Sequence, residues 1–185
     1  AAVAGVLDRA VAKGRLDASA RDATLARLRV TTALDDLADA GVVIEAAPER
    51  LDLKRDLFRR LEAIVRPDAA LATNTSTLSV AAIAAGLDHP ERVCGMHFFN
   101  PAPLMPLVEV IRGAATDDAT AARLVALARA WSKEPVEARD TPGFIVNRVA
   151  RPYYGEALRL LEDGAADVAT IDGLARDAGF PMGPF

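Results

Sequence analysis

Short apolar runs alternate with segments of helical periodicity between residues 41 and 140, and this alternation constrains the fold more than any other feature. The run GVVIEAA at 41–47 is rich in β-branched residues and is typical of a buried strand. Similar runs lie at 70–73, 92–99, 107–111 and 134–138, and segments with helical spacing lie at 51–65, 79–87 and 117–132. The alternation predicts an α/β fold in which a largely parallel sheet carries helices on both faces.

The spacing of apolar residues adds detail to this expectation. In the helix predicted at 51–65, one face carries Leu53, Leu57, Leu61 and Ile64. Before residue 41, the same reasoning predicts two helices, a short strand and one helical turn, at 3–14, 20–28, 29–34 and 35–40 respectively.

The segment RDTPG at 139–143 is the best candidate for a domain boundary, because Pro and Gly interrupt regular structure and no strand-like run follows. We expect residues 1–140 to form part of a doubly wound α/β domain, and residues 141–185 to begin an all-helical domain. A long helix with a kink at Pro152 is predicted after the boundary. One stripe of this helix carries Ile145, Val149, Tyr153 and Ala157.

A second helix is predicted in this region at about 168–178, before the turn-rich end GFPMGPF. Such an end packs little, so we expect more protein to follow it. The exposed part of the helical stripe favours a subunit interface.

Composition excludes several classes of function. The 22 basic residues are fewer than the 26 acidic ones, so a broad electropositive surface for nucleic acid is not expected. Cys94 is the single cysteine, which excludes an intramolecular disulfide and a thiolate metal cluster, and we expect no metal site. No apolar run approaches the length of a membrane span, and a cytoplasmic protein is expected.

Polar side chains follow the strand predicted at 70–73. Asn74, Thr75, Ser76 and Thr77 come directly after it, at the edge where open parallel sheets usually bind their ligands. An equally good interpretation is that Thr77 or Ser79 caps the next helix and that the others form a turn.

A second polar group surrounds the connection between the runs at 92–99 and 107–111. His97 and Asn100 leave the first run, and Glu109 lies inside the second. A histidine can accept a proton from an alcohol, and a carboxylate on its other ring nitrogen would orient it. The twelve positions between His97 and Glu109 let the chain turn back and bring them together, although a lone histidine after a strand is more often structural.

Several segments, in order, resemble the signatures of the 3-hydroxyacyl-CoA dehydrogenase family. The most specific is HFFNP at 97–101, within GMHFFNPAPLMPLVEVI. The others are VVIEAAPERLDLKRDLF, NTSTLS, DTPGFIVNRV and GFPMGPF, so the resemblance extends from about Gly41 to the last residue. It implies a partial Rossmann-like sheet, and reversible oxidation of a 3-hydroxyacyl-CoA to the 3-oxoacyl-CoA with NAD.

The resemblance also implies roles for individual residues. His97 matches the general base and Glu109 its carboxylate partner. Ser76, Asn100 and Asn147 match residues that line the substrate hydroxyl and the nicotinamide. These five are the candidate catalytic residues, and Asn147 would place the site between the two domains.

Glu49 and Lys54 match positions that contact the cofactor's ribose and the substrate side, although a solvated charge pair would explain both residues equally well. The candidate cofactor-binding residues are Glu49, Lys54, Asn74, Ser76 and Asn100. The family's N-terminal Gly-rich phosphate loop has no counterpart here, so we expect that this first segment is missing. The prediction of NAD as the cofactor therefore depends on the resemblance alone.

The resemblance further implies an acyl-CoA thioester as substrate and a homodimer in the intact enzyme. Two alternatives remain open from the residues themselves. One is a catalytically inert fragment that binds acyl-CoA or mediates oligomerisation. The other is an NAD-dependent dehydrogenase of another small hydroxy acid.

Overall fold

The computed structural model describes residues 2–185, in which one compact unit ends at Leu37 and a second spans Ala38–Phe185. In the first unit, α1 (Ala2–Ala12) packs against α2 (Ala18–Ala26), and a short 3₁₀ helix, η1, follows at Leu34–Leu37. Both predicted helices are confirmed. The strand predicted at 29–34 is wrong: Val30 is 96% exposed, and no strand within residues 2–185 pairs with its backbone.

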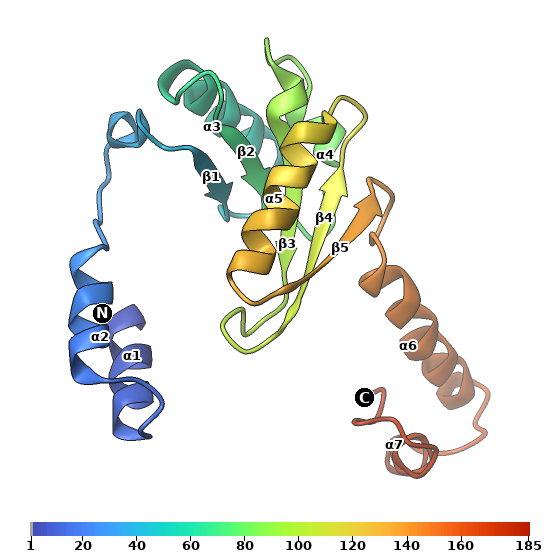
Figure 1. The fold of residues 1–185 in the computed structure, drawn as a ribbon. Coiled ribbons are helices and arrows are strands. Elements are labelled where there is room, and N and C mark those ends of the chain that lie inside the picture. Colours follow the sequence, from blue (N-terminus) through green and yellow to red (C-terminus); the bar gives the residue numbers. More distant parts are fainter. Residues whose placement is uncertain (1) are drawn as a thin grey trace. The chain divides into compact units, whose positions relative to one another are not determined.

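The second unit contains a five-stranded sheet (Figure 1). Its strands, in spatial and sequence order, are β1 (Val42–Glu45), β2 (Ala70–Thr73), β3 (Val93–Phe98), β4 (Leu107–Arg112) and β5 (Glu134–Arg139). Only the β3–β4 pair is antiparallel; the other three neighbouring pairs are parallel. The connection at 99–106 is too short for a crossover helix, so the chain must reverse there. The predicted α/β class with a largely parallel sheet is confirmed.

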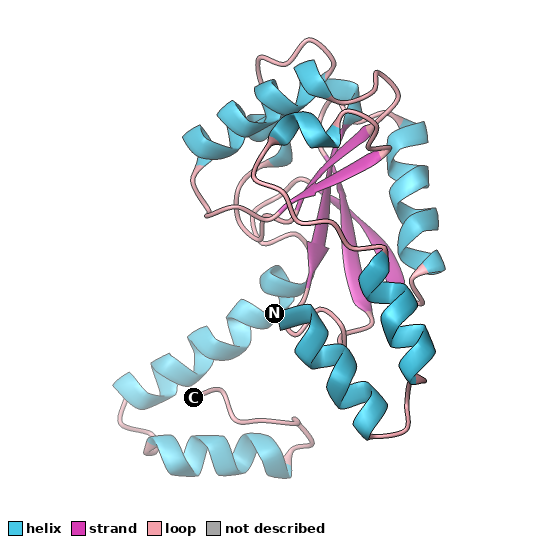
Figure 2. Ribbon diagram, turned by 90° about the vertical axis from the view of Figure 1, so that its left-hand side faces the viewer, coloured by secondary structure: helices cyan, strands magenta, loops and turns pink. Residues whose placement is uncertain are grey.

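Helices cover both faces of this sheet (Figures 1 and 2). On one face, α5 (Asp118–Ala130) buries Leu124 and Ala128 against Cys94 and Met96 of β3. On the other lie α3 (Leu51–Ile64) and α4 (Val80–Ala84). A Cβ atom at Gly95 would lie 2.8 Å from Ile111 Cβ of β4 and 3.1 Å from a methyl group of Val80, so glycine gives these elements room to pack closely. A short 3₁₀ helix, η2 (Pro90–Arg92), precedes β3.

The buried face of α3 differs from the predicted one by about one residue. Lys54, Phe58 and Leu61 are buried, whereas Leu53 is exposed. The prediction failed because it counted Lys54 as a surface residue. In the structure the Lys54 ammonium group pairs with the buried carboxylate of Glu45, so this edge of the helix faces the interior.

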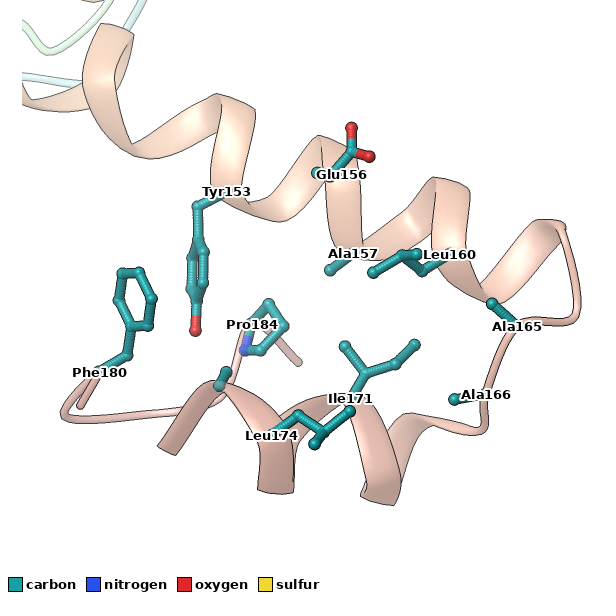
Figure 3. A pocket seen from close by; sticks show the side chains of 11 residues that line it. Tyr153, Glu156, Ala157, Leu160, Ala165, Ala166, Ile171, Leu174, Phe180 and Pro184 are labelled. Carbon is teal, nitrogen blue, oxygen red and sulfur yellow. The ribbon is translucent and has the colours of Figure 1, made fainter. Parts of the chain in front are cut away.

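Two helices follow the sheet: α6 (Val146–Glu162), which continues through Pro152, and α7 (Val168–Asp177). An apolar hollow of about 430 Å³ lies between them, and Figure 3 shows side chains that line it. Tyr153 closes one end, where its ring stacks on Phe180 with centroids 4.7 Å apart. Elsewhere on α6, Val149 is 73% exposed. None of the helices in residues 2–185 is both long and apolar enough to cross a membrane.

Candidate active site

A buried histidine–carboxylate pair lies on two adjacent strands. His97 of β3 and Glu109 of β4 are direct partners in the antiparallel register. The His97 Nδ1 and Glu109 Oε2 atoms are 2.7 Å apart, and the two residues are 7% and 1% exposed. Nδ1 therefore carries a proton toward the carboxylate, and Nε2 has no hydrogen-bond partner within residues 2–185. A pair in this state can accept a proton at Nε2.

The second oxygen of Glu109 holds the start of α6. Its Oε1 accepts hydrogen bonds from the backbone N–H groups of Ile145 and Val146, each at 2.9 Å. These N–H groups belong to the helix terminus, where no backbone acceptor within the helix is available. One side chain thus orients the imidazole and also places the first residues of α6, next to Asn147.

Two phenyl rings pack around the imidazole. The ring centroids of Phe99 and Phe144 lie 4.6 and 5.8 Å from that of His97. Phe144 is buried and has a positive φ of 47°, directly after Gly143 with φ of 77°. A left-handed backbone at a bulky residue is uncommon and persists only where its surroundings hold it. The turn therefore supplies a wall beside His97 that keeps water away from much of the ring.

The other three candidate catalytic residues lie on three different segments of the chain. Ser76 follows β2, Asn100 follows β3, and Asn147 is the second residue of α6. Within the described chain, none of these three side chains donates or accepts a hydrogen bond. The Asn74 Oδ1 atom accepts a hydrogen bond from the backbone N–H of Phe98 at 2.9 Å, which ties the loop after β2 to the end of β3.

Glu49 organises the loop after β2. Its Oε1 atom accepts hydrogen bonds from the Thr75 hydroxyl, from the Thr77 hydroxyl at 2.9 Å, and from the backbone N–H groups of Ser76 and Thr77 at 3.2 Å. Burial raises the pKa of the Glu49 carboxyl, but the hydrogen bonds from Thr75 and Thr77 and the nearby Lys54 charge outweigh it and lower that pKa to about 2. The side chain remains 37% exposed and ionised.

Lys54 makes different contacts from those expected of a residue on the substrate side. Its side chain is 1% exposed, and its ammonium group lies 2.7 Å from Glu45 Oε1, 3.1 Å from the Ala47 carbonyl oxygen and 3.3 Å from Glu49 Oε2. Three protein oxygens therefore surround the ammonium group. In this arrangement Lys54 acts on the site through Glu49.

Two acidic residues that the sequence analysis did not single out belong to this arrangement. Glu45 ends β1, binds Lys54, and accepts a hydrogen bond from the Thr73 hydroxyl at 2.7 Å. Asp140 accepts hydrogen bonds from the Ser79 hydroxyl at 2.7 Å and from two backbone N–H groups at the start of α4. The signal for Glu45 was available in the sequence, since an acid inside an apolar run needs a partner.

Comparison with known families matches two consecutive parts of the chain. Residues 1–141 match the family described as "3-hydroxyacyl-CoA dehydrogenase, NAD binding domain", and residues 143–185 match "3-hydroxyacyl-CoA dehydrogenase, C-terminal domain".

Among curated proteins, the 3-hydroxyadipyl-CoA dehydrogenase of Escherichia coli strain K12 is 52% identical over 179 residues, which is 96% of this chain and 38% of that protein. The fatty acid oxidation complex subunit alpha of Psychrobacter arcticus is 44% identical over 97% of this chain and 25% of that protein. The chain therefore spans well under half the length of these relatives.

Among solved structures, the 3-hydroxybutyryl-CoA dehydrogenase of E. coli K12 superposes with a TM-score of 0.97 at 50% identity, over 99% of this chain and 39% of that one. The (S)-3-hydroxybutyryl-CoA dehydrogenase of Ralstonia eutropha gives a TM-score of 0.94 at 40% identity, over 98% and 64% of the two chains.

Proposed function

Because the chain belongs to the 3-hydroxyacyl-CoA dehydrogenase family, we propose that the protein oxidises the 3-hydroxyl group of an acyl-CoA thioester to a ketone. The observation that carries this proposal is the buried pair of His97 and Glu109, which leaves the Nε2 atom of a correctly oriented imidazole open to a ligand. Catalysis by such a pair needs no further acid or base.

In the proposed reaction, His97 takes the proton of the 3-hydroxyl group at Nε2, while C3 of the substrate loses its hydrogen as a hydride. The resulting imidazolium is stabilised by the Glu109 carboxylate at Nδ1. Ser76, Asn100 and Asn147 would hold the hydroxyl oxygen and the nicotinamide amide, since their side chains have no other hydrogen-bond partner in the described chain. Phe99 and Phe144 would limit the access of water.

NAD is the proposed cofactor, and when bound it supplies the acceptor for the hydride. Glu49 is suited to bind the ribose of NAD, because its carboxylate is partly exposed, lies at the ligand-binding edge of the sheet and is ionised above a pH of about 2. Asn74 would stabilise this edge through Phe98, and Lys54 would orient Glu49. Glu49→Gln should weaken NAD binding about tenfold in calorimetry, as expected for one charge-assisted hydrogen bond.

The names of the relatives suggest two candidates for the acyl group. The adipyl group in the name of one E. coli relative ends in a second carboxylate, whereas the butyryl group in the names of the solved structures does not. We propose that a short-chain 3-hydroxyacyl-CoA is the substrate, with a dicarboxylic six-carbon acyl group as the first candidate.

The proposed domain boundary lies between residues 140 and 141, supported by the two ranges that match separate family domains. The intact protein is proposed to be a homodimer through its helical part, because α6 and α7 leave Val149, Leu158 and Leu174 exposed. Light scattering that gave a monomer at micromolar concentration would refute the homodimer. A cytoplasmic location is also proposed, in keeping with a single cysteine, Cys94, that is buried and free of a disulfide.

An absorbance assay of NADH formation tests the proposed reaction. The full-length protein should reduce NAD with a 3-hydroxyacyl-CoA and should show little activity with the free hydroxy acid. Turnover of the free acid alone would favour a dehydrogenase of another hydroxy acid. Acyl-CoA binding in calorimetry without turnover would favour an inert binding module.

A further inference from the structure

A hollow of about 650 Å³ lies between the loop after β2 and α6. Three arginines of α6, namely Arg148, Arg151 and Arg159, line it together with Thr77 and Gly143. The hollow is adjacent to the candidate active site in the chain: Thr77 follows Ser76, Gly143 precedes Phe144, and Arg148 follows Asn147.

Two of the three arginines give this hollow a positive charge that the described chain does not neutralise. Arg159 donates a hydrogen bond to Glu156 at 2.9 Å. Arg148 and Arg151 are exposed, and no carboxylate within residues 2–185 pairs with either guanidinium group. Guanidinium groups bind carboxylates and phosphates in a bidentate manner, so the hollow suits an anionic group of a ligand.

The arginines lie on the face of α6 that points away from α7. Figure 3 shows Tyr153, Ala157 and Leu160 directed toward α7, and residues 148, 151 and 155 fall on the opposite side of a helix with 3.6 residues per turn. Packing between the two helices therefore leaves Arg151 free for another partner.

Arg151 lies one helical turn beyond Asn147 on nearly the same side of α6, because residues four apart are neighbours on a helix surface. The rise between them is about 6 Å. In a six-carbon dicarboxylic acyl group, three carbon–carbon bonds separate the hydroxyl-bearing C3 from the terminal carboxyl carbon, a span of about 4 Å. A substrate whose hydroxyl lies at Asn147 could thus place its distal carboxylate at the Arg151 guanidinium.

We infer that Arg151, with Arg148 beside it, binds a carboxylate at the far end of the acyl chain and thereby selects dicarboxylic acyl thioesters. This inference rests on the proposed function, in which Asn147 holds the substrate hydroxyl. The phosphates of coenzyme A are the other anions that could reach these arginines, and they occur in every acyl-CoA. Two substrates of equal chain length therefore distinguish the two sources of negative charge.

The test compares 3-hydroxyadipyl-CoA with 3-hydroxyhexanoyl-CoA, which lacks the terminal carboxylate, in the full-length protein. Arg151→Gln should lower kcat/KM for the dicarboxylic substrate about 10- to 100-fold and change that for the hexanoyl substrate less than about twofold. Arg151→Lys should retain part of the preference because it keeps the charge. As a control, Arg129→Gln removes an exposed arginine of α5 that does not line the hollow. This variant should leave the ratio of kcat/KM for the two substrates unchanged.

Equal losses for both substrates would overturn the inference and favour binding of a coenzyme A phosphate. No loss for either would overturn it as well, while leaving the dehydrogenase activity intact. Calorimetry with adipyl-CoA and hexanoyl-CoA gives a readout that needs no turnover. There the wild-type protein should bind adipyl-CoA more tightly and Arg151→Gln should abolish the difference; equal affinity in the wild type would refute the inference even if the proposed reaction failed.

Discussion

Replacing Glu109 with glutamine tests the geometry of the site most directly. Both carboxylate oxygens accept hydrogen bonds: Oε2 from the His97 imidazole, and Oε1 from the N–H groups of Ile145 and Val146. Glutamine has one acceptor oxygen and one donor nitrogen. If its oxygen faces His97, its amide faces two N–H donors and releases the start of α6. If its nitrogen faces His97, Nδ1 must become the acceptor and Nε2 carries the proton.

Either orientation damages catalysis, for different reasons. An imidazole protonated at Nε2 cannot accept the substrate proton, and a base in the wrong tautomer loses on the order of 10⁴ in rate. In the other orientation the imidazolium loses its negative partner and Asn147 loses its anchor, so a loss of about 10² is expected. These limits correspond to about 3 to 5.5 kcal/mol of activation free energy.

The assay is steady-state NADH formation at saturating 3-hydroxyacyl-CoA, with NAD affinity measured separately by calorimetry. Glu109→Gln should lower kcat by 10² to 10⁴ and leave NAD affinity within about twofold. His97→Gln should fall at least as far, because no imidazole remains. Retention of more than about a tenth of the wild-type rate by either variant would refute the assignment of His97 as the base.

Three further predictions concern residues around the site. Lys54→Met leaves the buried Glu45 carboxylate without its partner, so thermal or urea unfolding should show a loss of about 3 to 5 kcal/mol; an unchanged stability would mean that the ion pair is not buried in solution. Asp140→Ala should speed amide hydrogen exchange in residues 141–148, whereas Asp117→Ala, which removes the cap of α5, should not; equal exchange in the two variants would exclude a role for Asp140 in holding the linker. Burial raises the pKa of the Cys94 thiol to about 12, so the folded protein should not react with a disulfide reagent at neutral pH until it is unfolded.

Most of the fold could be predicted from the sequence because the apolar periodicities of its strands and helices are distinct. The five strands and the helices of the second unit appear where spacing placed them. The strand predicted at 29–34 failed, since β-branched residues such as Val30 form a strand only where another strand pairs with them. Pairing across the sheet is not encoded in a local window.

The site was predictable in part for a similar reason. A histidine that acts as a base needs a carboxylate to orient it, and the twelve positions between His97 and Glu109 were enough to predict that pair. Spacing could not reveal that the same carboxylate also holds α6, because backbone donors have no sequence signature. The contacts of Lys54 and Asp140 could not be predicted from their residue types. A lysine on a helix is usually exposed, and an aspartate before Thr-Pro-Gly is usually part of a turn.

Because β3 and β4 pair in an antiparallel manner, the geometry of the His97–Glu109 pair does not depend on the length of the connection between the two strands. His97 and Glu109 are opposite each other in the register, so main-chain hydrogen bonds of the sheet set their separation. Insertions or deletions in residues 101–106 would leave that separation unchanged. During divergence, this connection could therefore acquire new lengths and new contacts while proton transfer stayed the same.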